Sequence, residues 1–96
     1  MKRISVFGAT GSVGQNTLDL IRRDRQKYHL VSLTGGQNLE LLVRDALEFS
    51  PECVVTADEA MYHELKDCLQ GSGIEVLAGR SGLIDAADRS AELAMS

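Results

Sequence analysis

The sequence lacks any long hydrophobic run. No stretch of its 96 residues approaches the ~18 consecutive apolar residues that a membrane-spanning helix requires. The basic start, Lys2-Arg3, is followed by only a few apolar residues before Gly8, which is too short for the apolar region of a secretory signal peptide. We therefore expect a cytoplasmic protein that does not bind membranes.

Metal-binding and catalytic patterns are also missing. Cys53 and Cys68 have no second cysteine pair with which to form a zinc site or a disulfide framework, so we expect two free thiols packed in the core. His29 and His63 have no Cys, Asp or Glu at metal-ligand spacing, and no two carboxylates suggest an acid–base pair. The sequence predicts no catalytic residue and no metal ligand in this chain.

Positive charge is scarce overall but locally concentrated. The formal net charge is −4, and a broad basic face is what general nucleic-acid binding requires, so we expect no nucleic-acid partner. Most of the basic excess lies in Arg22, Arg23, Arg25 and Lys27. We interpret this cluster as the C-terminus of a helix, where cations complement the helix dipole.

What the sequence does contain is an alternation of short β-type and longer helical segments. Apolar residues make up 44% and charged residues 25%, as in ordinary globular domains. The pattern predicts strands at residues 4–7, 28–33, 53–56, 74–78 and 91–95, and helices at 12–25, 39–49, 58–69 and 81–87. Five strands separated by helices predict an α/β fold, a doubly wound parallel sheet with helices on both faces. Because the chain stops inside an apolar segment, we expect the sheet to be truncated in or after its fifth strand.

The helical segments have apolar stripes and termination signals. Asn38 and Asp58 are predicted N-caps, while Ser50-Pro51 and Gly71 are expected to follow helix ends. The residues expected to face the core are Val13, Thr17, Leu18 and Ile21 in the first helix, Leu39, Leu42, Val43, Ala46 and Leu47 in the second, Met61, Leu65, Cys68 and Leu69 in the third, and Leu83, Ile84 and Ala87 in the fourth.

A glycine motif carries the chemistry. Residues 8–14 read Gly-Ala-Thr-Gly-Ser-Val-Gly between the first strand and the first helix, a variant of the Rossmann dinucleotide fingerprint. Gly8 allows the sharp turn, Gly11 lets a phosphate approach the backbone, and Gly14 permits close packing of the helix. The N–H groups at the start of the helix would bind the phosphate, with the hydroxyls of Thr10 and Ser12 beside them.

The end of the second strand indicates which cofactor binds. An NAD site usually has Asp or Glu here to hold the ribose 2′-hydroxyl, but residues 33–38 read Leu-Thr-Gly-Gly-Gln-Asn. An uncharged glycine turn accepts a 2′-phosphate without repulsion, which favours NADP, although Gly35-Gly36 also fits a plain tight connection. Gly79-Arg80-Ser81-Gly82 follows the fourth strand near the expected reversal of strand order, where it would either touch a ligand or only begin a helix.

Beyond these patterns, the sequence resembles the 1-deoxy-D-xylulose 5-phosphate reductoisomerases. The resemblance is carried by ISVFGATGSVGQNTLDLI, LTGGQNLELL, EFSPECVVTADEAMYHELK and GIEVLAG, and it covers essentially all 96 residues. It implies that residues 1–96 are an incomplete N-terminal NADP-binding Rossmann-like domain, with catalytic and C-terminal domains absent. By itself this fragment is expected to be inactive.

The resemblance also implies an activity for the full-length enzyme and roles for residues of this chain. That enzyme converts 1-deoxy-D-xylulose 5-phosphate to 2-C-methyl-D-erythritol 4-phosphate in isoprenoid biosynthesis with NADPH and Mg²⁺ or Mn²⁺, typically as a homodimer. Its metal and substrate-phosphate ligands would lie beyond residue 96. The residues implied to contact the cofactor are Thr10, Gly11, Ser12 and Val13 at its phosphates, and Gly36, Gln37 and Asn38 around the adenosine ribose and 2′-phosphate. The family commonly has Lys or Arg where this chain has Gln37.

Two other functions fit the same residues. One is the NADP-binding domain of another reductase with a GATG start, such as a semialdehyde dehydrogenase. The other is a non-catalytic module that senses nucleotides.

Overall fold

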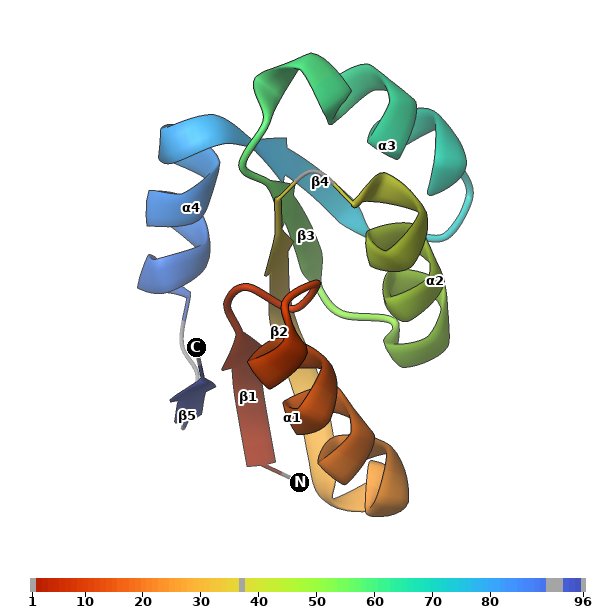
Figure 1. Ribbon diagram of the computed structural model, residues 1–96, viewed down its shortest axis with the longest axis vertical. Coiled ribbons are helices and arrows are strands. Elements are labelled where there is room, and N and C mark those ends of the chain that lie inside the picture. Colours follow the sequence, from red (N-terminus) through yellow and green to blue (C-terminus); the bar gives the residue numbers. More distant parts are fainter. Residues whose placement is uncertain (1, 37, 90–92, 96) are drawn as a thin grey trace.

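The computed structural model describes residues 2–36, 38–89 and 93–95 and shows one parallel sheet with helices on both faces (Figure 1). The strands are β1 (Lys2–Val6), β2 (Tyr28–Gly35), β3 (Cys53–Thr56), β4 (Glu75–Ala78) and β5 (Leu93–Met95). The helices are α1 (Ser12–Arg23), α2 (Leu39–Phe49), α3 (Tyr62–Cys68) and α4 (Gly79–Asp88), with 3₁₀ turns at Arg25–Lys27 and Glu59–Met61. This confirms the predicted α/β fold.

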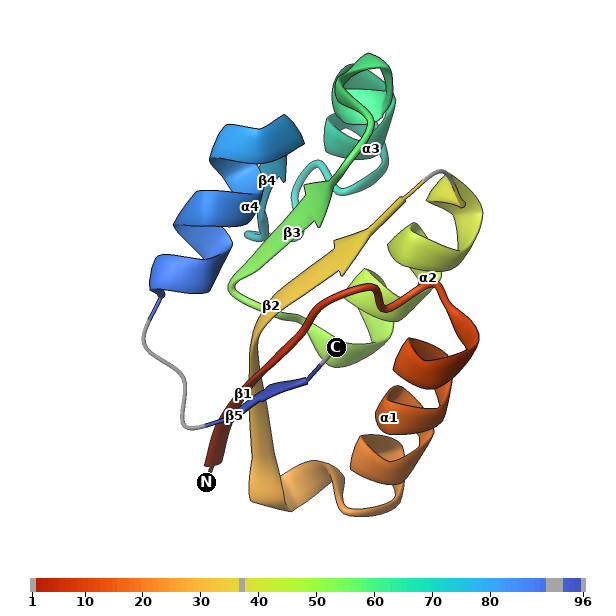
Figure 2. The same ribbon diagram turned by 60° about the vertical axis from the view of Figure 1, so that its left-hand side comes forward.

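The sheet has the order β4-β3-β2-β1-β5. The chain moves outward from β1 through β2 and β3 to β4, and then crosses back to place β5 on the other side of β1. Right-handed crossovers put α1, α2 and α3 on one face and α4 on the other (Figure 2). The order therefore reverses beside β1. Residues 79–82 follow the edge strand β4, so the expectation that they lie near the reversal is wrong.

The hydrophobic core lies mainly beneath α1, α2 and α3. In β1, Ile4 and Val6 face this core, while Phe7, which follows β1, packs toward α4. The register of β1 against β2 shifts between Ile4 and Ser5. The buried apolar side chains from the three helices are Leu18, Ile21, Leu42, Ala46, Phe49 and Leu65, and Leu69 follows α3.

Several predicted core positions are wrong. Val13, Leu47 and Ile84 are exposed by 61%, 54% and 54%, and Cys68 and Ala87 are also exposed. In α1, α2 and α4 the inner face also includes small or polar residues that the apolar pattern did not predict. These residues are Gly14 in α1, Asp45 in α2, and Gly82 with Ala86 in α4.

The helix ends follow local chemistry. The Asn38 side chain accepts a hydrogen bond from the Leu41 N–H at 3.1 Å, which confirms the predicted N-cap of α2. Ser50 ends α2 in the left-handed conformation, with φ of 48°. Asp58 caps the 3₁₀ turn rather than α3 itself, through the Ala60 N–H. Among the described residues, no helix is both long enough and apolar enough to cross a membrane.

Candidate dinucleotide site

The loop from Gly8 to Gly14 leaves the carboxyl end of β1 and is held against β2. Gly8 has φ of +72°, a left-handed conformation that favours glycine. Its N–H donates to Thr34 Oγ1 at 2.9 Å, and the Ala9 N–H donates to the Thr34 carbonyl at 2.7 Å. Thr34 is 4% exposed. The start of the loop is therefore anchored to the adjacent strand, a contact that no sequence signal indicated.

The N-terminus of α1 is open to a ligand. Gly11 is its N-cap and provides no side-chain hydrogen bond, and the first turn contains no acidic residue. The first N–H groups of any helix lack acceptors within that helix, and the helix dipole makes this end partly positive. Ser12 and Val13 are exposed here. These features suit the binding of a phosphate group.

The last two glycines of the motif have different surroundings. A Cβ on Gly14 would lie 2.3 Å from the Gly8 carbonyl oxygen and 2.6 Å from Ala9 Cα, so the helix approaches the loop too closely for any side chain. A Cβ on Gly11 would be 3.5 Å from the Gly8 oxygen, an ordinary contact. Gly14 is thus required for packing, whereas the fold itself tolerates a side chain at position 11.

The turn after β2 lies next to this loop. The Gly36 N–H donates to Thr10 Oγ1 at 3.5 Å, and Thr56 Oγ1 donates to the Gly36 carbonyl at 3.3 Å. A Cβ on Gly35 would come within 3.0 Å of Thr10 Cγ2. Thr10 and Gly36 are therefore brought together, and Asn38 caps α2 nearby. Gln37 itself lies outside the described residues.

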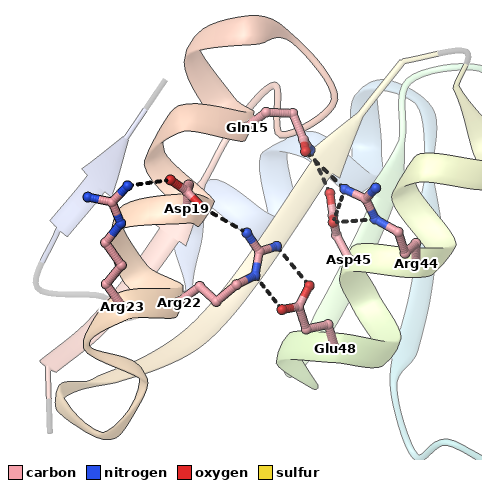
Figure 3. Close-up of polar contacts among 7 residues, drawn as sticks. All are labelled: Gln15, Asp19, Arg22, Arg23, Arg44, Asp45 and Glu48. Carbon is pink, nitrogen blue, oxygen red and sulfur yellow. Dashed lines mark hydrogen bonds and ion pairs between the residues drawn. The ribbon is translucent and has the colours of Figure 1, made fainter.

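Polar contacts join α1 and α2 beside the site (Figure 3). Gln15 donates to the Ala9 carbonyl at 2.8 Å and to Asp45 Oδ2 at 2.6 Å. Arg44 donates to Gln15 Oε1 and to Asp45 Oδ1, both at 3.1 Å. Asp45 was not foreseen because its polarity argues against burial. The available signal was its place among the apolar residues Leu42, Ala46 and Phe49 of α2.

A second set of polar contacts joins α1 and α2 near their C-terminal ends. The Arg22 guanidinium donates two hydrogen bonds to the Glu48 carboxylate, one of them from Nη2 at 2.8 Å, and also contacts Asp19. The hydrogen bond from Arg22 holds the pKa of Glu48 below its ordinary value, and the same bond raises the pKa of Arg22. Arg22 and Arg25 also lie over the Phe49 ring. The basic cluster thus completes the end of α1, as interpreted from the sequence.

The other reactive side chains lie apart from this loop. Cys53 is buried against Ser32, and desolvation raises the pKa of its thiol, while Cys68 is exposed. His29 pairs with Glu52 at 2.8 Å, and His63 stacks edge-on against Tyr62. Within residues 2–36, 38–89 and 93–95, no three His, Cys, Asp or Glu side chains are grouped so as to hold a metal ion.

The parallel sheet, its reversal beside β1 and the glycine loop at that point define a Rossmann-like fold of the dinucleotide-binding class. Comparison with known proteins specifies the family. The model of the family 1-deoxy-D-xylulose 5-phosphate reductoisomerase matches residues 4–96, and the chain belongs to this family.

Individual relatives agree. The chain is 49% identical over 96 residues to the reductoisomerase of Ruegeria sp. (strain TM1040), and 52% identical over 92 residues to that of Sinorhizobium fredii. These alignments cover 100% and 94% of the chain but only 24% of each relative. The chain therefore spans about a quarter of the length of its curated relatives.

Solved structures show the same fold. The reductoisomerase from Zymomonas mobilis in complex with NADPH superposes with a TM-score of 0.94 at 38% identity, over 97% of this chain and 25% of that one. A reductoisomerase in complex with NADPH, fosmidomycin and magnesium superposes with a TM-score of 0.91 at 30% identity, over 98% of this chain and 24% of that one.

Proposed function

We propose that residues 1–96 form the N-terminal NADPH-binding part of a 1-deoxy-D-xylulose 5-phosphate reductoisomerase. The observation that carries this proposal is the uncapped N-terminus of α1 beside Gly36 at the end of β2. Family membership and the NADPH named in two solved relatives support it. The match over residues 4–96 favours this function over a semialdehyde dehydrogenase or a nucleotide-sensing module.

Each part of the site has a proposed role. The backbone N–H groups of Thr10, Ser12 and Val13, with the Thr10 hydroxyl, bind the cofactor phosphates. Gly11 contacts the phosphates through its backbone without a Cβ, since its own N–H donates to the Gly8 carbonyl at 3.1 Å. Gly36, Gln37 and Asn38 surround the adenosine ribose and its 2′-phosphate. Bound NADPH supplies the hydride for the reduction, and this chain holds and orients the cofactor.

The full-length protein is proposed to isomerise and reduce 1-deoxy-D-xylulose 5-phosphate to 2-C-methyl-D-erythritol 4-phosphate in isoprenoid biosynthesis. We propose that it is a cytoplasmic homodimer that needs Mg²⁺ or Mn²⁺, held by residues outside this segment, and that residues 1–96 alone are inactive.

The test is NADPH oxidation by the full-length protein. Oxidation should require both the sugar phosphate and Mn²⁺, and residues 1–96 alone should show none. A full-length protein that consumes no NADPH with this substrate would refute the proposed activity. Substrate-dependent oxidation by residues 1–96, in a preparation free of host enzyme, would refute their proposed inactivity.

A further inference from the structure

Asp45 carries the one fully buried charge among the described residues, with 0% exposure. A buried carboxylate is costly unless it is hydrogen-bonded and paired. Gln15 from α1 satisfies its Oδ2 at 2.6 Å, and the half-exposed Arg44 satisfies its Oδ1 at 3.1 Å (Figure 3). The charge is therefore neutralised inside the α1–α2 contact, close to the glycine loop.

The orientation of the Gln15 amide follows from its partners. Its Nε2 lies near two acceptors, the Ala9 carbonyl and the Asp45 carboxylate, and its Oε1 lies near a donor, Arg44. If the amide were flipped, its oxygen would face the oxygens of Ala9 and Asp45, and its NH₂ group would face the Arg44 guanidinium. Asp45 and Arg44 thus point the Gln15 N–H group toward the Ala9 carbonyl.

The Ala9 carbonyl belongs to the peptide that precedes Thr10. In a planar trans peptide the carbonyl and the following N–H point in opposite directions. Because Gln15 holds the carbonyl at 2.8 Å, the Thr10 N–H points away from the α1–α2 contact. If this peptide rotated, a carbonyl oxygen would replace the N–H on the side where the phosphate is proposed to bind.

We infer that Gln15 is a positioning residue for the cofactor, one that keeps the Ala9–Thr10 peptide turned so that its N–H serves the phosphate. Asp45 and Arg44 act through Gln15 by fixing its amide. This inference rests on the proposed binding of NADPH at the loop.

The test uses the full-length enzyme with Gln15→Met, which keeps side-chain length and helix propensity but removes the hydrogen bonds. Loss of one hydrogen bond to the loop should weaken NADPH binding by roughly five- to tenfold in a fluorescence titration. The KM for the sugar phosphate and the kcat at saturating NADPH should not change.

Thr17→Val is the matched control, because the Thr17 hydroxyl donates to the Val13 carbonyl at 3.0 Å, a hydrogen bond within α1 rather than to the loop. It should leave NADPH affinity unchanged. An equal loss of affinity in the control would overturn the inference.

A second variant separates positioning from stability. Gln15→Met leaves one oxygen of buried Asp45 without a partner, so its Tm should fall. The double variant Gln15→Met/Asp45→Leu removes that oxygen, and its Tm should recover, but NADPH binding should stay weak because the Ala9 carbonyl still lacks its donor. Affinity that recovers together with Tm would overturn the inference.

The outcomes also distinguish this inference from the proposed function. If the wild-type enzyme does not bind NADPH, the proposed function fails. If the wild type binds NADPH and Gly11→Val abolishes binding while Gln15→Met binds normally, the proposed function holds and the inference about Gln15 fails.

Discussion

The two ends of α1 are built in opposite ways. At the C-terminal end, Arg22 and Arg23 satisfy the helix dipole and are themselves paired with Asp19 and Glu48. At the N-terminal end, Gly11 offers no side-chain cap and the first turn contains no acidic residue. One end is thus completed by the protein, whereas the other has free N–H groups that suit an anion. The difference separates residues that stabilise the helix from residues that are proposed to serve a ligand.

The largest expected effect comes from adding a side chain where the helix meets the loop. Gly14→Ala would place a Cβ against backbone atoms of Gly8 and Ala9, and overpacking of this kind costs about 3 kcal/mol of unfolding free energy. Urea denaturation of the full-length enzyme measures the loss. Gly11→Ala is the control, with less than about 1 kcal/mol expected. Equal losses would contradict the distinction between the two glycines.

Gly11→Val should abolish NADPH binding while leaving the fold intact. Gly11 has φ of −81°, which valine adopts, so the stability cost is limited to a poorer N-cap, about 1 kcal/mol. The branched side chain would hold the pyrophosphate away from the N–H groups, and we expect a loss of roughly 100-fold or more. Cofactor titration together with circular dichroism measures both effects. Normal affinity would show that Gly11 does not face the phosphate.

Ser12→Asp should change stability and binding in opposite directions. A carboxylate in the first turn complements the helix dipole and should add about 0.5 kcal/mol of stability. The same charge should repel the cofactor phosphates and weaken NADPH by roughly tenfold. Parallel thermal unfolding and cofactor titration test the pair of effects. Ser12→Asn, which is polar but uncharged, should not weaken binding. If Ser12→Asp binds NADPH as tightly as Ser12→Asn, the phosphates do not lie at this end.

Gln37→Arg should tighten NADPH by a few-fold, up to roughly tenfold, because a charge-assisted hydrogen bond to the 2′-phosphate replaces a neutral one. NADH should scarcely respond, and the gain should shrink as salt is raised. Gln37→Glu should do the reverse and favour NADH. Titrations of both cofactors at two ionic strengths measure these changes. Equal responses of NADPH and NADH would mean that position 37 does not read the 2′-phosphate.

The smallest effect is expected at the completed end of α1. Because the pKa of Glu48 is lowered in the folded protein, the carboxylate adds stability above its ordinary pKa of 4.5, and this stability is lost as pH falls through the folded pKa. Glu48 is 37% exposed, so solvent limits the gain, and Glu48→Gln should cost about 0.5 kcal/mol near neutral pH. Urea denaturation across a pH series measures it. A cost that persists in acid would exclude the ion pair as its source.

The sequence predicted most of the fold because its signals were local. Strand 53–56 and the Asn38 cap are confirmed, since branched residues and a side-chain cap act over a few positions. The glycine loop was found because positions such as Gly8 and Gly14 have conformations or contacts that favour glycine. The burial of Asp45 was not predicted, because it depends on Gln15, thirty residues away. The anchoring role of Thr34 was missed for the same reason, since its partners Gly8 and Ala9 lie in the loop that follows β1.

The anchoring of the loop by Thr34 has a kinetic consequence. Two backbone N–H groups are tied to this one buried residue at 2.9 and 2.7 Å, so the start of the loop loses its conformational freedom when the protein folds. A ligand that arrives later does not have to order that segment, and the entropy of ordering is not subtracted from its binding free energy. We therefore expect the cofactor to associate without a rearrangement of residues 8 and 9.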